Sequence, residues 1–334
     1  MNKSLIIFAK PKIFNMKRSI LFFTLLMASF SSAQFFDDLK DVLAATSSDA
    51  QLLADAYISP VGQSLAYGLN TGWTSSAKTH KKLGFDLTIG AALPRVSDAA
   101  KTFNTADLGL KQLVPSANTA STVFGSKNTA TFTESISGKT IELPGFEDDL
   151  IMNSMPVPYI QAGVGLFFDT DLIVRYVPKV KTKGLEVDVL GIGIKHNLMQ
   201  YFGVFDKLPL NVSALASFSK LNGSYQLSNT NPDQQVTLGV DTFMLQALAS
   251  LDFPIISVVG GLGYGKGDAS IKLLGDYSTE FPGTPKDPIN SENTYTGMHA
   301  MIGARANLLF LKIFANYTLQ EFNTLNLGVS FNFR

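Results

Sequence analysis

The sequence contains no cysteine among its 334 residues. A disulfide scaffold, a zinc site built on thiolates and a cysteine nucleophile are therefore excluded. Charged residues are scarce as well, at 16% of the chain against about 25% in an average soluble protein. The 27 basic and 27 acidic residues leave no positive excess to neutralise phosphates, so we expect no nucleic-acid partner. With 46% apolar residues, the chain is also too hydrophobic to be disordered.

Sequence motifs of catalysis are scarce too. The histidines His80, His196 and His299 are far apart, and none belongs to the HExxH motif of zinc proteases. No GxSxG elbow of a serine hydrolase occurs. Residues 260–267 read GGLGYGKG, but Gly267 stands where a phosphate-binding loop needs Ser or Thr. We therefore expect no enzyme activity, no metal and no cofactor.

Residues 1–33 have the three parts of a secretory signal peptide: a basic start at 16–18, an apolar stretch at 19–30 and small residues before Gln34. The apolar stretch is shorter than the roughly 20 residues of a transmembrane helix. Residues 1–15 precede a second Met, and we interpret this Met16 as the true start of translation, so that 1–15 are an over-called start. A buried N-terminal helix is the alternative interpretation.

No later segment approaches 18 continuous apolar residues, so we expect no transmembrane helix. Apolar residues instead alternate with small or polar ones, as they do on the two faces of a strand. The alternation is clearest at 83–93, 160–168, 298–308 and 325–333. A soluble sandwich and a membrane barrel both give this pattern. The low charge and the segment length of about ten residues favour an all-β, transmembrane antiparallel β-barrel.

The pattern predicts eleven strands, at 64–73, 83–93, 157–168, 171–178, 184–199, 209–227, 236–251, 255–274, 294–308, 311–319 and 324–333. Bacterial single-chain barrels contain an even number of strands, with short turns on the periplasmic side. Residues 94–156 must then add one or three strands, which predicts a barrel of 12–14 strands.

Two kinds of connection follow from this topology. The polar segments 228–235 and 275–293 fall outside the cell, and the tight links 169–171 and 252–254 fall on the periplasmic side. We interpret Asn222-Gly223 as a bulge in a long strand and expect a second bulge near Leu190.

Residues 34–60 have helical rather than alternating spacing. We predict one or two short helices there, forming a plug in the lumen or a periplasmic cap, with the barrel at 61–334. A row of alternating glycines would let another backbone approach closely, as a plug would. This predicted plug-contact stripe is Gly261, Gly263, Gly265 and Gly267.

Charged side chains within the strand pattern are few. The residues predicted to face the lumen are Asp86, Arg175, Glu186, Asp188, His299 and Arg305. In a narrow barrel they would pair with one another, and in a wider one they would line a pore or a ligand site.

The last strand resembles the C-terminal assembly signal of outer-membrane proteins. Asn326, Gly328, Phe331 and Phe333 have the expected offsets, and Arg334 after the final aromatic residue is a departure. The resemblance implies the barrel assembly machinery as a partner.

Several blocks together resemble an uncharacterised family of Bacteroidota outer-membrane β-barrel proteins. They are residues 57–73, 83–87, 172–179, 191–198, 260–264 and the closing strand. This resemblance implies the outer membrane of a Gram-negative bacterium as the location and outer-membrane lipid as a partner. In architecture alone, the chain is also similar to long-chain fatty-acid transporters, fourteen-stranded barrels with an N-terminal plug.

Three functions are compatible with these features. The favoured one is binding or passage of a small hydrophobic molecule, because the predicted lumen is poor in charge. The alternative is a structural or surface-interaction protein that contacts partners through outer loops such as 275–293. A lipid-modifying enzyme has the least support, because no catalytic constellation is recognisable.

Overall fold

The computed structural model describes residues 39–44, 47–147, 153–182, 184–202, 209–228, 230–278 and 283–333. The predicted signal peptide lies outside these residues, as does the start of the predicted plug.

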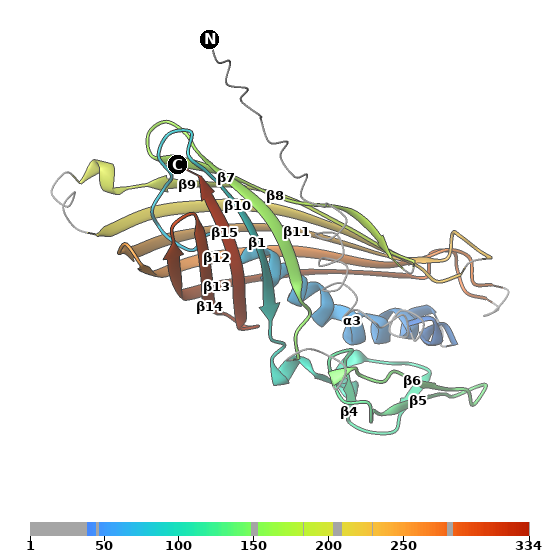
Figure 1. The fold of residues 1–334 in the computed structure, drawn as a ribbon. Helices are drawn as coiled ribbons and strands as arrows, with labels where there is room; N and C mark the ends of the chain where they lie inside the picture. Colours follow the sequence, from blue (N-terminus) through green and yellow to red (C-terminus); the bar gives the residue numbers. More distant parts are fainter. Residues whose placement is uncertain are drawn as a thin grey trace, which may run out of the picture.

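The described residues form a closed antiparallel barrel of ten strands. Neighbouring strands along the chain pair with each other, and β1 closes the barrel between β7 and β15 (Figure 1). The strands are β1 (Phe85–Pro94), β7 (Val157–Gly165), β8 (Thr170–Thr182), β9 (Leu185–Asn197), β10 (Leu210–Gln226), β11 (Gln235–Asp252), β12 (Ile256–Leu274), β13 (Ile289–Leu308), β14 (Leu311–Leu319) and β15 (Thr324–Phe333). The closed sheet confirms the predicted all-β barrel.

The connections differ between the two ends of the barrel. At one end, which we call the tight-turn end, residues 166–169, 253–255 and 309–310 join neighbouring strands. Phe168, Asp169 and Leu309 adopt positive φ there, as tight hairpins require. The opposite loop end carries the described residues of 227–234, of 275–288 and of the long connection from β1 to β7. The predicted separation of long polar segments from tight links is therefore confirmed.

The predicted count of 12–14 strands is wrong. Residues 64–73 belong mainly to the helix α3 (Ser47–Asn70), and the described residues of 95–156 add no strand to the barrel. Leu65 and Leu69 are buried with Ala66 between them, because strands and loops surround this helix on several sides. Its apolar residues therefore do not form one helical stripe, and short-range alternation imitates a strand.

The outward face of the barrel carries an apolar belt. On β13, outward residues change from Thr294 and Thr296 to Met298, Ile302 and Leu308. The apolar part covers ten residue steps, which at a tilt of about 40° corresponds to about 25 Å along the barrel axis. This height matches the lipid-facing band of membrane barrels. Within the described residues, no helix is long and apolar enough to cross a membrane.

The bulge predicted at Asn222-Gly223 is absent from the pairing of β10, and the bulge predicted near Leu190 lies on the neighbouring strand. β10 pairs residue by residue with β9 and β11 through Gly223. The irregularity near Leu190 lies in β8, where the pairing with β9 shifts between Val177 and Val180. Pro178 occupies this bulge, consistent with its lack of an N–H group for a regular ladder.

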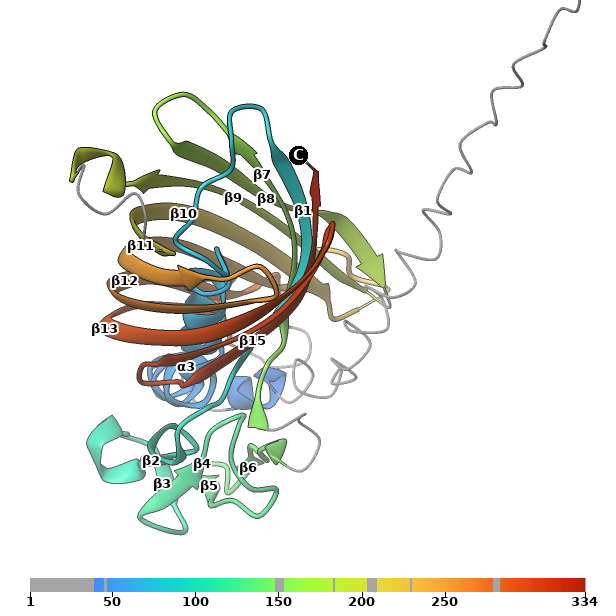
Figure 2. The same ribbon diagram turned by 60° about the vertical axis from the view of Figure 1, so that its left-hand side comes forward.

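α3 begins at the loop end and packs between the long strands and a small subdomain (Figures 1 and 2). The subdomain is formed by residues 95–147, with a two-stranded and a three-stranded sheet. Its elements are η2 (Asp98–Ala100), β2 (Thr102–Asn104), η3 (Thr105–Leu108), β3 (Leu113–Pro115), β4 (Thr119–Ser121), β5 (Thr131–Glu134) and β6 (Thr140–Glu142); η1 (Val42–Ala44) and η6 (Met199–Tyr201) lie elsewhere. Tyr57 and Ile58 of α3 share one hydrophobic core with Phe124 and Phe132 of the subdomain.

Candidate functional site

α3 contacts the barrel wall where both surfaces carry small residues. A Cβ atom on Gly62 would lie 2.6 Å from the Cβ of Ala269, and one on Gly267 would overlap with Ala66. Gly62 and Ala66 lie four residues apart on one face of the helix, and they pack closely against Ala269 and Gly267 of β12, which also lack large side chains. Next to this contact, the Tyr295 hydroxyl donates to the main-chain oxygen of Ser59 at 2.7 Å.

The C-terminal end of α3 meets a buried cation of the wall. Arg175 of β8 is fully buried and donates to the main-chain oxygens of Leu69 and Thr71 at 3.0 Å. Its guanidinium lies 4.2 Å from the ring centroids of both Trp73 and Tyr159. The positive charge therefore caps the negative end of the helix dipole and stacks on two aromatic rings.

Residues 71–84, which we call the lumen segment, run from α3 through the barrel to β1. Side chains from several strands hold its main chain. Asn316 donates to the Thr74 oxygen at 2.9 Å, and Gln161 donates to the Trp73 oxygen at 3.1 Å. Ser250 accepts from the Ala77 N–H at 3.0 Å. The lumen segment thus satisfies its backbone through polar side chains of the wall.

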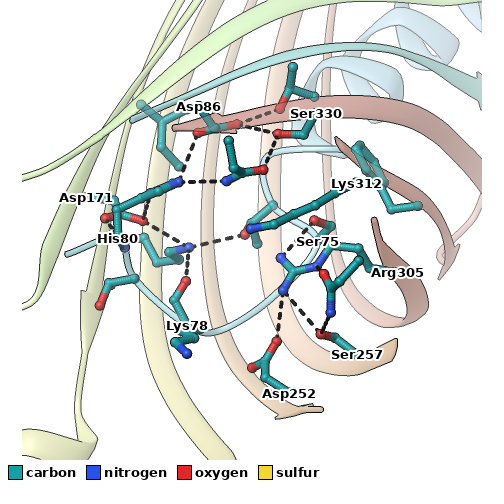
Figure 3. Close-up of a pocket in the computed structure, with 18 of the residues that line it drawn as sticks. Ser75, Lys78, His80, Asp86, Asp171, Asp252, Ser257, Arg305, Lys312 and Ser330 are labelled. Atoms are coloured by element: carbon teal, nitrogen blue, oxygen red, sulfur yellow. Dashed lines mark hydrogen bonds and ion pairs between the residues drawn. The ribbon is translucent and has the colours of Figure 1, made fainter. Parts of the chain in front are cut away.

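A cavity of about 480 Å³ lies beside the lumen segment (Figure 3). It is lined from the tight-turn ends of several strands and includes exposed residues such as Lys78 and Phe253 at that end. Its lining includes Trp73, Ser75, Lys78, His80, Lys81, Asp86, Asp171, Ile173, Lys195, Asp252, Phe253, Ser257, Arg305, Lys312, Phe314, Ser330 and Asn332.

Two ion pairs lie among the side chains that line the cavity. Lys195 lies 3.1 Å from Asp171, its partner across the β8–β9 ladder, and donates to the main-chain oxygen of Lys78 at 2.8 Å. Arg305 lies 3.0 Å from Asp252 and donates to Ser257 at 3.2 Å. All four charged groups are largely buried, so each needs its partner to offset lost hydration.

His80 connects two carboxylates of the cavity. Its Nδ1 lies 3.1 Å from Asp171 and its Nε2 lies 3.5 Å from Asp86. Asp86 also accepts from Thr88 at 2.7 Å and from Ser330 at 2.9 Å. Among the residues that the structure describes, no three His, Cys, Asp or Glu side chains are arranged to hold a metal ion.

A family model matches residues 16–333 of the sequence, and its description is a family of unknown function, DUF6588. The chain belongs to the DUF6588 family. Membership of an uncharacterised family confirms that part of the interpretation from sequence. A comparison with curated proteins finds no match.

Solved structures similar to this DUF6588 chain include outer-membrane proteins of several bacteria. Ail, the attachment invasion locus protein of Yersinia pestis, has 11% identity and a TM-score of 0.29, over 76% of this chain and 100% of its own. The protease OmpT of Escherichia coli has 8% identity and a TM-score of 0.33, over 77% and 100%. The toluene transporter TbuX of Ralstonia pickettii has 9% identity and a TM-score of 0.24, over 76% and 90%. At these TM-scores, the similarities assign no function to the DUF6588 chain.

Four of the six residues predicted to face the lumen lie inside the barrel. Asp86 and Arg305 line the cavity, Arg175 holds α3, and His299 is buried beside Gly263.

Glu186 and Asp188 face outward instead, so their prediction is wrong. Glu186 pairs with Lys181 and with Lys179, whose side chains are mostly exposed, while Val187 and Val189 point to the core. This part of β9 extends beyond the apolar belt, where outward residues become polar without any change of face.

The predicted glycine stripe is divided between two environments. Gly265 and Gly267 lie against Asn70 and Ala66 of α3, whereas Gly261 and Gly263 lie under side chains of neighbouring strands. A Cβ on Gly263 would lie 2.6 Å from the Nε2 of His299.

The predicted assembly-signal residues alternate between the two faces of β15. Asn326 is buried and Gly328 packs under Phe314, whereas Phe331 and Phe333 lie on the outward face. Phe333 stacks on Phe85 with ring centroids 4.9 Å apart.

Sequence reasoning missed several cavity residues of the DUF6588 chain. Lys195 and Lys312 were not selected, although each shares the face of its strand with inward residues such as Gly193 and Phe314. Strand parity was therefore the available signal. His80 lies outside any strand, and its place in the lumen segment carries no local signal.

Proposed function

We propose that the protein is an outer-membrane β-barrel that binds a small molecule in the cavity at the tight-turn end of its lumen. The observation that carries the proposal is the cavity itself. Its volume of about 480 Å³ lies within the range of ligand pockets, and polar and aromatic side chains converge on it.

The apolar belt and the closed sheet support a location in the outer membrane of a Gram-negative bacterium. In such barrels the short turns face the periplasm. The cavity would then be reached from the periplasm, with α3 and the subdomain on the outer side.

The cavity suits a molecule with both a polar and an apolar part. Trp73, Ile173, Phe253 and Phe314 supply apolar lining, whereas the ion pairs supply the polar lining. This qualifies the small hydrophobic ligand expected from sequence. Passage through the barrel would require α3 and the lumen segment to move, so we propose binding as the basal role.

We propose a binding role rather than catalysis because the cavity's histidine is already engaged. Both ring nitrogens of His80 face carboxylates, and Nε2 also lies 3.2 Å from the amide nitrogen of Asn332. This arrangement positions His80 in a polar network and offers no nucleophile to activate.

The test uses Trp73, which is the single tryptophan of the sequence and lines the cavity. We would follow its emission in neutral-lipid nanodiscs during titration with hexanol, hexylamine and hexanoate. Saturable changes with at least one probe, absent in the cavity-filling variant Ser75→Phe, support the proposal. No saturable response to any probe, or an equal response in Ser75→Phe, contradicts it. Heat modifiability on a detergent gel confirms that each variant is folded.

One observation favours a second role in surface interaction. The connection from β1 to β7 folds into the subdomain at the loop end, where Val114 and Ile136 are 59% and 81% exposed. Exposed apolar side chains on an ordered loop domain suit contact with another molecule. Loss of cell-surface adhesion in a Val114→Ser/Ile136→Ser variant would support this role, and unchanged adhesion would oppose it.

A further inference from the structure

Lys312 is a cation of the cavity without an anionic partner. It lies near the start of β14, on the inward face that also carries Phe314 and Asn316. Figure 3 shows its side chain extending from the strand toward the middle of the cavity. Among the described residues, no hydrogen bond or ion pair joins its ammonium group to another side chain or to the main chain.

The three carboxylates of the cavity are engaged by residues other than Lys312. Asp171 is engaged by Lys195 and His80, and Asp252 is engaged by Arg305. The carboxylate of Asp86 is held by hydroxyl groups and His80.

The lining as a whole has an excess of positive charge. It contains five cationic residues, Lys78, Lys81, Lys195, Arg305 and Lys312, and three carboxylates, Asp86, Asp171 and Asp252. Leaving His80 aside, the cations outnumber the carboxylates by two, and Lys78 and Lys81 are the exposed members of the set. In an enclosure partly screened from water, such an excess attracts and orients an anion.

Building on the proposed function, we infer that the cavity binds a small organic anion. The acidic group of this ligand lies against Lys312, and its apolar part lies toward Phe314 and Trp73. An anion at this position supplies the missing partner of a partly desolvated ammonium group, which is costly to leave unpaired. Lys195 and Arg305 are already paired with Asp171 and Asp252. The anion therefore binds at Lys312 rather than at these two cations.

The same Trp73 titration tests this inference through the difference between probes of equal chain length. Hexanoate should bind at least about tenfold more tightly than hexanol or hexylamine, the ratio that corresponds to one good charge interaction. Lys312→Gln should remove this preference, and Lys312→Arg should retain it. Lys220→Gln is the control, because Lys220 is exposed on β10 and does not line the cavity. Its affinity for hexanoate should stay within about threefold of the wild type, since an exposed charge is screened by solvent.

The outcomes separate this inference from the proposal on which it rests. Hexanol binding that Ser75→Phe removes, without a preference for hexanoate, overturns the anion site and leaves a small-molecule cavity. Unchanged hexanoate affinity in Lys312→Gln likewise overturns the assignment of Lys312. The absence of a saturable response to all three probes overturns both.

Discussion

The guanidinium group of Arg175 lies 4.2 Å from the ring centroid of Trp73. Through this contact and its hydrogen bonds to Leu69 and Thr71, a wall residue fixes the end of α3 and the start of the lumen segment. Buried hydrogen bonds from a charged donor contribute about 1.5–3 kcal/mol each, so this contact is a main anchor of α3 and the lumen segment, which together we call the plug.

We therefore expect Arg175→Met to loosen the plug while the barrel still forms. The main-chain acceptors at the end of α3 would lose their hydrogen-bond donor, and the helix would move away from the barrel wall more often. Planar-bilayer recordings should show openings that are rare in the wild type. Arg95→Met is the control, because Arg95 is exposed at the end of β1. Equal conductance in all three proteins would show that Arg175 does not hold the plug.

The contact between α3 and β12 gives a second expectation. Gly267→Val places a branched side chain against Ala66 and should displace the helix, whereas Gly239→Val meets open space on β11. Only Gly267→Val should increase the uptake of small solutes into proteoliposomes. If both variants behave like the wild type, the small-residue contact does not determine where the helix sits.

Much of the barrel was predictable from sequence because strand alternation is a local signal. Ten of the eleven predicted segments overlap barrel strands. The failure at 64–73 has a physical cause: Leu65 and Leu69 lie on a helix enclosed by other elements, so its burial pattern lacks one clear face. The outward position of Glu186 depended on how far β9 extends beyond the belt, which no local pattern records.

The site was less predictable than the barrel. Asp171 and Lys195 form a cross-strand pair, and their contact requires the register that the bulge in β8 allows. The inward direction of Lys312 follows from strand parity, but its lack of a partner depends on the whole cavity. The main-chain bond from Lys195 to Lys78 depends on the path of the lumen segment, which has no regular pattern.

The N-terminal turn of α3 should make the contact with the subdomain sensitive to acid. Asp49 is fully buried and accepts hydrogen bonds from the N–H groups of Lys111, Gln112 and Leu113. Burial acts to raise the pKa of its carboxyl, but these hydrogen bonds outweigh burial and hold the pKa below its usual value. The stabilisation is therefore present above the unfolded pKa of about 4 and is lost as the pH falls through the lower native value.

Hydrogen exchange of residues 111–113 should report this loss. We expect several-fold stronger protection in the wild type than in Asp49→Asn at pH 6, with the two converging at the lowest pH at which the barrel stays folded. Comparing the two proteins at each pH removes the intrinsic pH dependence of exchange. A difference that stays constant down to pH 2 would contradict a role for the Asp49 charge.

The outward aromatics of β15 should be required for membrane assembly. Replacing Phe331 and Phe333 with Asp places two anions on the lipid-facing surface, at a cost of up to about 2 kcal/mol each, depending on depth. We expect little mature protein in the outer-membrane fraction. Asn332→Ser changes the inward residue between them and should assemble normally. Normal levels of the double variant would show that these rings are not needed on that face.

The most direct test of a lumen closed at the loop end uses the absence of native cysteine. Ser75→Cys places a thiol in the cavity, Ser137→Cys places one on the exposed subdomain, and Ser64→Cys places one in the buried face of α3. Each variant would be treated with a membrane-impermeant maleimide, first in intact cells and then after the outer membrane is permeabilised.

We predict labelling of Ser137→Cys in intact cells, labelling of Ser75→Cys only after permeabilisation, and no labelling of Ser64→Cys in either state. Labelling of Ser75→Cys in intact cells as fast as Ser137→Cys would contradict a barrel plugged from the outer side.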